Sequence, residues 1–488
     1  MKTLVRKAET LAGAGYCIKA AMAYMEAAEL STSKLECMRL KRLAAGESMA
    51  CGHIAEGRAL VVPLLVKHGI SDPKTGRPLA MRLLWQLLIL GVRPFARSFP
   101  GKTGFDNPLA VEMVDCCFTA GKGFIAIEPM TGLFYLLKSL FLALKTSDSF
   151  RIARSLWLSG AVLCQANFRL GGPGTDLLMA AKKCLEQCRT PYQEGLLSIA
   201  FAQASMKESR WEEMLRLCDT GVRILGDHCT NVSWEITAGR ISGLYALQKK
   251  GDIRELLERC GKLSTDSRQA GNILGQVAAE TFSAYWDIAR GNPALAREKA
   301  AKAAQLFAGR SYSVQLFYAH RIFVYSDVYE GHIQNGLIRL DKTLKTMNKS
   351  SLIRFDIPRL DAWILTARVN LVAAVDSPAN RDYFLGRAAR FGRLLRKDRR
   401  IDSMAYGHAF EAGVAHLKGD KAKASKGLDA SLELFERAGM DLMAECVGFR
   451  QHQLVGCCNH PDMEIFSKIA IHSPEKWLDM IIPGFEDE

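Results

Sequence analysis

The sequence is poor in proline, with 15 prolines among 488 residues. Because proline interrupts helices, its scarcity leaves long stretches free to be helical. Long apolar runs are also missing. The run at 83–92 (LLWQLLILGV) is too short to cross a bilayer, and the run at 132–144 (GLFYLLKSLFLAL) has Lys138 at its centre. We therefore expect both runs to be buried core helices and expect no membrane insertion.

A disulfide framework is not indicated, although the chain has 14 cysteines. Cys17, Cys37 and Cys164 lie inside apolar helical patterns, as small buried hydrophobic residues do. The stretch at 1–17 includes Glu9 and has no leucine-rich apolar segment, so it does not resemble a secretory leader. We expect a cytoplasmic protein with reduced thiols.

Several catalytic signatures are absent from the sequence. It has no His-Arg-Asp loop, no Asp-Phe-Gly, no His-Glu-x-x-His and no Gly-x-Ser-x-Gly. The segment PGKTGF at 100–105 resembles a phosphate-binding loop, but Ala96 stands where that loop needs a glycine. We predict that this chain alone is not an enzyme and uses no cofactor.

Two cysteine groups remain as candidate metal ligands. Cys184 and Cys188 are one helical turn apart, while Cys457, Cys458 and His460 form the second group. A zinc site needs four ligands with defined geometry, and neither group supplies them alone. We interpret them as packed or partly exposed thiols, and a metal- or thiol-dependent enzyme using the second group stays an alternative.

A glycine followed by a polar stretch and a new helical pattern recurs along the chain. Gly251, Gly291 and Gly331 stand 40 residues apart. Gly419 follows after a gap that has room for one more unit, with its turn at 375–382. Each glycine fits the left-handed residue that commonly ends a helix. The pattern predicts a repeat of helical hairpins.

The residue after each glycine is expected to begin the next helix. Asp252, Asn292 and Asp420 are good N-cap residues. In the phrases CGHIAEG and EGHIQNG, His53 and His332 occupy the same position. We therefore interpret both histidines as turn residues. A metal-ligand role for them would need further ligands nearby in space.

Apolar residues between the turns follow the helical period. One stripe steps through Ile333, Leu337, Leu340, Leu344 and Met347, and small residues such as Ala296, Ala300 and Ala303 mark another helix. We expect an all-α fold, a tetratricopeptide-like α-solenoid formed by a superhelix of antiparallel helical hairpins with a period of about 40 residues.

Loop-rich stretches divide the predicted array. We expect an N-terminal helical-repeat subarray at 1–168, with a loop-rich insert near 92–108. A boundary at 169–176 precedes a C-terminal subarray at 175–475, and a tail follows at 476–488.

The formal charge of +14 favours acidic partners without specifying one. The strongest local signal is the stretch at 381–400, which has eight basic and two acidic residues. Within it, Arg387, Arg390, Arg393 and Lys397 share one helical face. This stripe is either a solvated outer face, a surface for an acidic partner protein, or a nucleic-acid contact serving a transcription-regulator array. We favour the solvated face over the acidic partner, and regard nucleic acid as the least supported.

Several phrases also resemble a known family. They are AAGESMACGHIAEGRALVVPLLVKHGI (44–70), SFRIARSL (149–156), CTNVSWEITAGRISGLYALQKKGDIREL (229–256), and AECVGFRQHQLVGC with SPEKWLDMIIPGF within 444–485. The resemblance is to the C-terminal region of large bacterial eukaryotic-like serine/threonine protein kinases. In that family a kinase domain and an AAA- or STAND-type ATPase precede a tetratricopeptide-like array.

The resemblance implies a role in bacterial kinase signalling. No catalytic residue carries over, because the kinase and ATPase motifs have no counterparts here. Trp234, Glu235 and the Pro483-Gly484-Phe485 phrase resemble positions of the array, with Trp234 in a core and Glu235 capping or pairing. We expect a non-catalytic scaffold for protein–protein interaction that works with a kinase or ATPase in cis or in trans. The cis alternative is that this chain is the separated C-terminal part of a larger kinase–ATPase.

Overall fold

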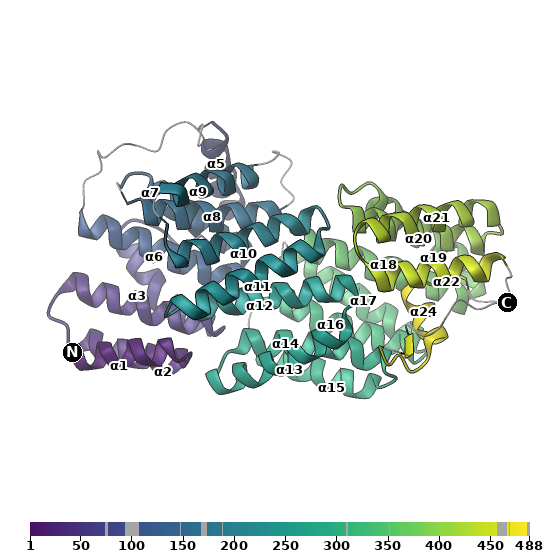
Figure 1. The fold of residues 1–488 in the computed structure, drawn as a ribbon, viewed down its shortest axis with the longest axis horizontal. Coiled ribbons are helices and arrows are strands. Elements are labelled where there is room, and N and C mark those ends of the chain that lie inside the picture. The colour runs from purple at the N-terminus through teal and green to yellow at the C-terminus, as the bar shows by residue number, and fades with distance from the viewer. Residues whose placement is uncertain are drawn as a thin grey trace. The chain divides into compact units, whose positions relative to one another are not determined.

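The structure, a computed structural model, consists of α-helices and their connections in all the residues that it describes (Figure 1). These residues are 1–73, 77–92, 107–146, 148–166, 173–187, 189–308, 311–350, 352–455, 466–467 and 469–485. They contain no β-strand, which confirms the predicted all-α class. In this part of the chain, no helix has the length and apolarity needed to cross a membrane.

The helices follow one another with short connections. The first are α1 (Lys2–Gly13), α2 (Cys17–Glu29), α3 (Lys34–Ala50), α4 (Ile54–Lys67), α5 (Arg77–Val92), α6 (Pro108–Ile125), α7 (Pro129–Ala143), α8 (Ser149–Gln165) and α9 (Pro173–Gln187). The middle ones are α10 (Pro191–Lys207), α11 (Trp211–His228), α12 (Ser233–Lys250), α13 (Ile253–Ala270) and α14 (Ile273–Ala289). The last are α15 (Pro293–Leu306), α16 (Val314–Tyr329), α17 (Ile333–Ser350), α18 (Asp356–Asp376), α19 (Arg381–Arg396), α20 (Ile401–Leu417), α21 (Lys421–Arg437), α22 (Asp441–Val455) and α24 (Pro474–Ile481).

The chain forms two compact units. Unit 1 contains Met1–Ala204, Met214–Gly243 and Leu263–Gln276, and unit 2 contains Ser205–Glu213, Leu244–Lys262 and Val277–Glu488. Helices α10 to α14 therefore contribute residues to both units. The predicted boundary at 169–176 lies partly outside the described residues, so the division into subarrays at 1–168 and 175–475 stays a prediction.

The glycine turns have the predicted conformation. Gly251, Gly291 and Gly331 have φ angles of 87°, 76° and 81°. At each turn the next backbone N–H donates to the carbonyl five positions earlier, as from Asn292 to Asp287 at 2.8 Å. This pattern is the Schellman motif, in which a left-handed glycine ends the helix and satisfies its last carbonyls.

The predicted N-caps are confirmed at the same turns. The side chains of Asp252, Asn292 and Asp420 each accept a hydrogen bond from the backbone N–H three residues later, at 3.3, 3.1 and 3.0 Å. His53 and His332 occupy the equivalent position between the glycine and the next helix, as predicted. The left-handed glycine and the N-cap residue therefore specify where one helix ends and the next begins.

Unit 1 contains both of the apolar runs noted in the sequence. The run at 132–144 forms most of α7, and Leu133, Leu136 and Leu140 are fully buried, as predicted. Helix α6 packs closely on α7, because a Cβ on Gly121 would lie 2.8 Å from the backbone nitrogen of Leu136.

The expectation that the run at 83–92 is a buried core helix is wrong for one of its faces. Helix α5 packs against α7, which buries Leu83, Leu87 and Leu90. The opposite side leaves four large apolar side chains exposed, namely Met81, Leu84, Trp85 and Leu88. A helix that is apolar all round does not reveal from its sequence how many neighbours it has.

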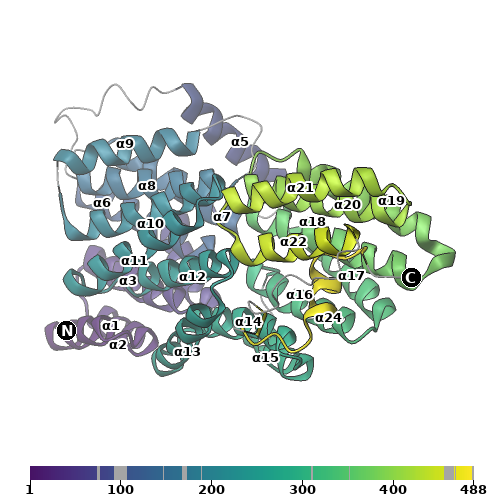
Figure 2. The ribbon, with the colours of Figure 1, turned by 45° about the vertical axis from the view of Figure 1, so that its right-hand side comes forward.

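In unit 2, each helix from α15 to α22 packs against the next one, which is the arrangement of an α-solenoid (Figure 2). The predicted stripe is confirmed, since Ile333, Leu340 and Met347 are buried. Each hairpin consists of an even-numbered helix followed by an odd-numbered one, from α12–α13 to α20–α21. The even-numbered helices are therefore equivalent positions of successive hairpins.

Candidate binding site

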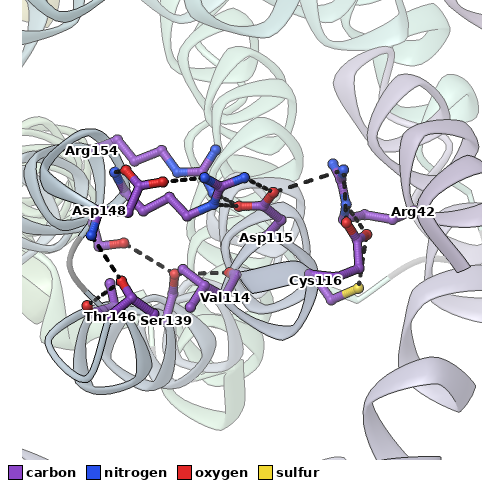
Figure 3. Close-up of polar contacts among 12 residues, drawn as sticks. Arg42, Val114, Asp115, Cys116, Ser139, Thr146, Asp148 and Arg154 are labelled. Atoms are coloured by element: carbon purple, nitrogen blue, oxygen red, sulfur yellow. Dashed lines mark hydrogen bonds and ion pairs between the residues drawn. The ribbon is translucent and has the colours of Figure 1, made fainter. Parts of the chain in front are cut away.

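A cluster of buried ion pairs joins α3, α6 and α8 in unit 1 (Figure 3). Asp115 of α6 accepts two hydrogen bonds from Arg151, at 2.7 and 2.8 Å, and another from Arg154. Arg42 of α3 pairs with Glu112 and lies 3.9 Å from Asp115. These five residues and Asp148 are the unit 1 ion cluster.

Opposite charges balance in the unit 1 ion cluster, which has three arginines and three carboxylates. Asp148 caps α8 by accepting from the Arg151 N–H at 3.0 Å, and it also pairs with the Arg151 side chain. Burial alone would raise the pKa of Asp115, but the neighbouring arginines hold it below its usual value. Because each charge has an opposite partner, we interpret this cluster as a structural tie between helices.

A second buried group of charges in unit 2 surrounds a cavity of about 50 Å³. Its lining comes from α12, α14, α16, α18 and α20, the first helices of successive hairpins, together with α22 and α24. The surface that α12 to α22 share in this way is the even-helix face. Its rings and charges at the cavity are Tyr245, Lys249, Tyr285, Trp286, Arg321, Tyr325, Asp361, Arg368 and Tyr406.

The carboxylates of the even-helix face have unequal partners. Lys249 Nζ lies 3.5 Å from both Asp361 and Asp402. Arg321 is also 3.5 Å from Asp361. Asp402 has a closer partner in Arg400, with hydrogen bonds of 2.9 and 2.8 Å. Burial alone would raise the pKa of Asp402, but Arg400 and Lys249 lower it to about 2.

Positive charge and hydrogen-bond donors are in excess at this cavity. Three cations, Lys249, Arg321 and Arg368, line it together with one carboxylate, Asp361. The buried pair of Arg400 and Asp402 lies beside Lys249. The Nε1 atom of Trp286 and the Nε atom of Arg321 on the even-helix face are buried without a partner among the described residues, and so is the Nε1 atom of Trp477 in α24. Because an unsatisfied buried donor is costly, this arrangement suits acceptor oxygens, which water or a peptide backbone can supply in a cavity of this size.

In unit 1, the half-buried side chain of Glu47 interacts with Cys17, which helps to line a separate cavity of about 370 Å³. Burial raises the pKa of Glu47 to about 7, while Lys122 and a hydrogen bond with Cys17 act in the opposite direction. Lys122 is itself paired with Glu235 at 2.8 Å, and Tyr192 donates to the same Glu235 oxygen at 3.0 Å. Glu235 therefore pairs within the array, as predicted.

The predicted basic stripe lies on α19, an odd-numbered helix. Arg390 and Arg393 are exposed there, and so is Lys397, the residue that follows the helix. Arg387 is half-buried and donates to Asp341 of α17 at 3.1 Å, so one of the four cations already has an acidic partner within the chain. None of the four lines the cavity of the even-helix face. Their use by an acidic partner stays a prediction.

The candidate metal ligands are not gathered into a site in the part of the chain that the structure describes. His53 lies 3.6 Å from Glu56, and His332 lies 3.5 Å from Glu330. No group of three or more His, Cys, Asp or Glu side chains there is placed to hold a metal ion. Cys188, Cys457, Cys458, His460 and the loop at 100–105 lie outside the described residues, and Cys184 is buried.

Sequence reasoning missed the charges of the even-helix face. Asp361 and Arg368 interrupt the apolar pattern of α18, and a charge inside an apolar helical stretch is a signal of a buried partner. Arg400 belongs to the basic stretch at 381–400, yet it is buried against Asp402 at the start of α20. A charge run in the sequence thus contained both surface and core residues.

A scan against models of protein families finds no match for this chain, and a search of the curated proteins also finds none.

Proposed function

We propose that this chain is a non-catalytic helical-repeat module that binds a segment of a partner protein on the even-helix face. The observation that carries the proposal is the gathering of rings, guanidinium groups and unsatisfied donors from α12 to α22 on one surface. Aromatic rings bind apolar side chains, and buried N–H donors bind main-chain carbonyls. Successive hairpins of a solenoid often present such extended surfaces to partners.

The partner that the resemblance favours is a bacterial serine/threonine kinase with an AAA- or STAND-type ATPase, acting in the cytoplasm. It stands either in the same polypeptide or in a separate one. Occupancy of the even-helix face would bias the kinase or ATPase through its different affinity for two states of the array.

Site-specific photo-cross-linking in cells of the source organism tests this proposal. A cross-linking amino acid at Gln248, which lines the cavity, is compared with one at exposed Lys262 on α13. We expect a kinase–ATPase to be cross-linked from position 248 and not from position 262. Equal labelling from both positions, or phosphotransfer activity of the purified chain that persists after contaminants are removed, contradicts the proposal.

A further inference from the structure

The segment from Ile471 to Phe485, the C-terminal segment, lies against the even-helix face (Figures 1 and 2). Its only helix, α24, packs against α16 and α18. After α22 the described chain does not add another hairpin to the stack. It contacts Ala289 at the end of α14 and His416 on α20, so this short segment reaches several equivalent helices.

Apolar anchors hold the C-terminal segment. Trp477 is 1% exposed, and its ring faces Tyr285 and Trp286 at centroid distances of 5.5 and 5.6 Å. At the other end, Phe485 is also 1% exposed and stacks on His416 at 5.2 Å. Both rings therefore enter positions that the even-numbered helices provide.

Side chains of the even-helix face also bind the backbone of the segment. Arg368 Nε donates to the Ile481 carbonyl and Arg450 Nε to the Ile482 carbonyl, each at 2.9 Å. The last carbonyls of a helix have no partner within that helix and carry partial negative charge. The excess positive charge of the face is thus matched to the C-terminal end of α24.

The contact between Pro483-Gly484 and α20 requires two glycines. A Cβ on Gly413 would lie 2.6 Å from the Pro483 carbonyl oxygen. Gly484 has a φ of 95°, in the region that other residues rarely adopt, and a Cβ there would lie 3.1 Å from Gly413 Cα. His416 Nδ1 is 2.9 Å from the Gly484 carbonyl oxygen. The face is shaped to a peptide backbone at this point.

We propose that the even-helix face is a peptide-binding groove and that the C-terminal segment is its ligand in cis. A partner protein displaces this segment by presenting a peptide segment of the same chemistry. That segment has an aromatic and an aliphatic anchor, exposed helix-end carbonyls and a Pro-Gly-aromatic turn. This inference rests on the proposed function, which it deepens by specifying the ligand.

Cleavage of the folded full-length chain tests the inference. A protease recognition sequence is inserted between residues 460 and 461 and cut after purification, and a fluorescent synthetic peptide of residues 469–485 is then added. We expect the cut segment to stay bound and to exchange with the peptide in a saturable way, measured by fluorescence anisotropy, while the helical circular dichroism signal is unchanged. If the cut segment does not exchange under excess peptide, or if helicity is lost during exchange, the segment is part of the core. Either result overturns the inference.

Peptide variants separate specific binding from general adhesion. Replacing Trp477 by alanine in the peptide should weaken binding about 30-fold or more, as for a buried aromatic anchor. The Gly484→Ala peptide should bind about 10-fold more weakly because its left-handed conformation is lost. The Glu475→Gln peptide is the matched control, since Glu475 is exposed, and it should bind within about twofold. Equal binding of all four peptides contradicts the groove.

Hydrogen exchange of the unmodified protein gives an independent test. If the segment is a ligand in cis, amides of Trp477 to Ile482 should exchange by local opening, faster than the core amides of α16 and α18. Equal protection of the segment and these helices overturns the inference. If the peptide exchanges but no kinase is cross-linked from position 248, the groove is retained and the proposed kinase partner is rejected. The two failures are therefore distinguishable.

Discussion

The unit 1 ion cluster and the even-helix face of unit 2 bury similar residue types with different pairing. Asp115 accepts hydrogen bonds from two arginines, and three cations balance three anions around it. At the even-helix face, Lys249 lies 3.5 Å from its nearest carboxylates, and cations outnumber anions around a cavity. A balanced cluster pairs its own charges, whereas the extra cations of an unbalanced cluster need acceptors from elsewhere in the protein.

The C-terminal segment supplies part of what the even-helix face needs. The guanidinium groups of Arg368 and Arg450 reach the carbonyls of Ile481 and Ile482 instead of relying on carboxylates alone. Burial of charge by itself therefore does not mark a functional site. The informative feature is charge whose partners come from a separate segment of chain.

Asp115→Asn should have the largest effect on stability. It removes the shared anion of the unit 1 ion cluster and leaves Arg151 and Arg154 buried with less compensation. We expect a loss of about 3 kcal/mol in the free energy of unfolding. Urea denaturation followed by circular dichroism measures it. The control is Asp227→Asn at an exposed position of α11, expected to change the free energy of unfolding by less than about 0.5 kcal/mol. Equal effects of the two variants would remove the distinction between a structural cluster and the surface.

The stability of unit 2 should depend on pH because of Asp402. Its folded pKa of about 2 is below the ordinary value for aspartate, so the ionised form is favoured by folding. The resulting contribution of about 2 kcal/mol is present above about pH 5 and is lost as the pH falls toward 2. Asp402→Asn should lower stability at pH 7 and flatten this acid dependence. An unchanged slope between pH 5 and 2 in the variant would show that Asp402 does not titrate as described.

Glu47 should produce the opposite pH dependence in unit 1. Burial raises its folded pKa to about 7, so folding favours the protonated form, although Lys122 and Cys17 partly oppose this. The stability of unit 1 should therefore fall as the pH rises from about 4.5 to 7. Because the Glu47 side chain is partly exposed to solvent, we expect this loss of stability to be only about 1 kcal/mol. Glu47→Gln should remove this fall and be more stable than the native chain at pH 8; lower stability there would contradict the sign.

Lys249→Met should have the smallest effect, although the side chain is buried. Asp402 keeps Arg400, and Asp361 keeps the Tyr318 hydroxyl at 3.1 Å and Arg321. Removing one excess cation while keeping its apolar stem should change the free energy of unfolding by less than about 1 kcal/mol. Thermal unfolding beside Arg151→Met measures the contrast, and a larger loss for Lys249→Met would show that the cation excess is structural.

The sequence predicted local structure well where the signal itself was local. Gly251 and Gly291 needed left-handed conformations, and Asp252 and Asn292 capped the helices that follow. Both devices depend on hydrogen bonds within a few residues, so a single stretch of sequence contains the whole interaction. The buried stripe through Leu340 followed from the same helical period.

The candidate site was not predictable in the same way. The charges of the basic stripe of α19 are close in sequence, yet Arg390 and Arg393 are exposed, and Arg390 lies over the ring of its neighbour Phe391. Arg368 interrupts the apolar pattern of α18, and its carbonyl partner at Ile481 is more than one hundred residues away. A single charged residue whose partner is distant in the chain gives only a weak sequence signal.

By itself, the sequence determined the all-α class, the hairpin turns and the helix caps of this protein, because these depend on backbone conformation and neighbouring hydrogen bonds. Only the tertiary structure decided which buried charges balance one another and that Trp477 and Phe485 return to the even-helix face. Ion pairing and ring packing depend on distances between helices far apart in the chain, and equivalent positions of successive hairpins come together only when the hairpins stack.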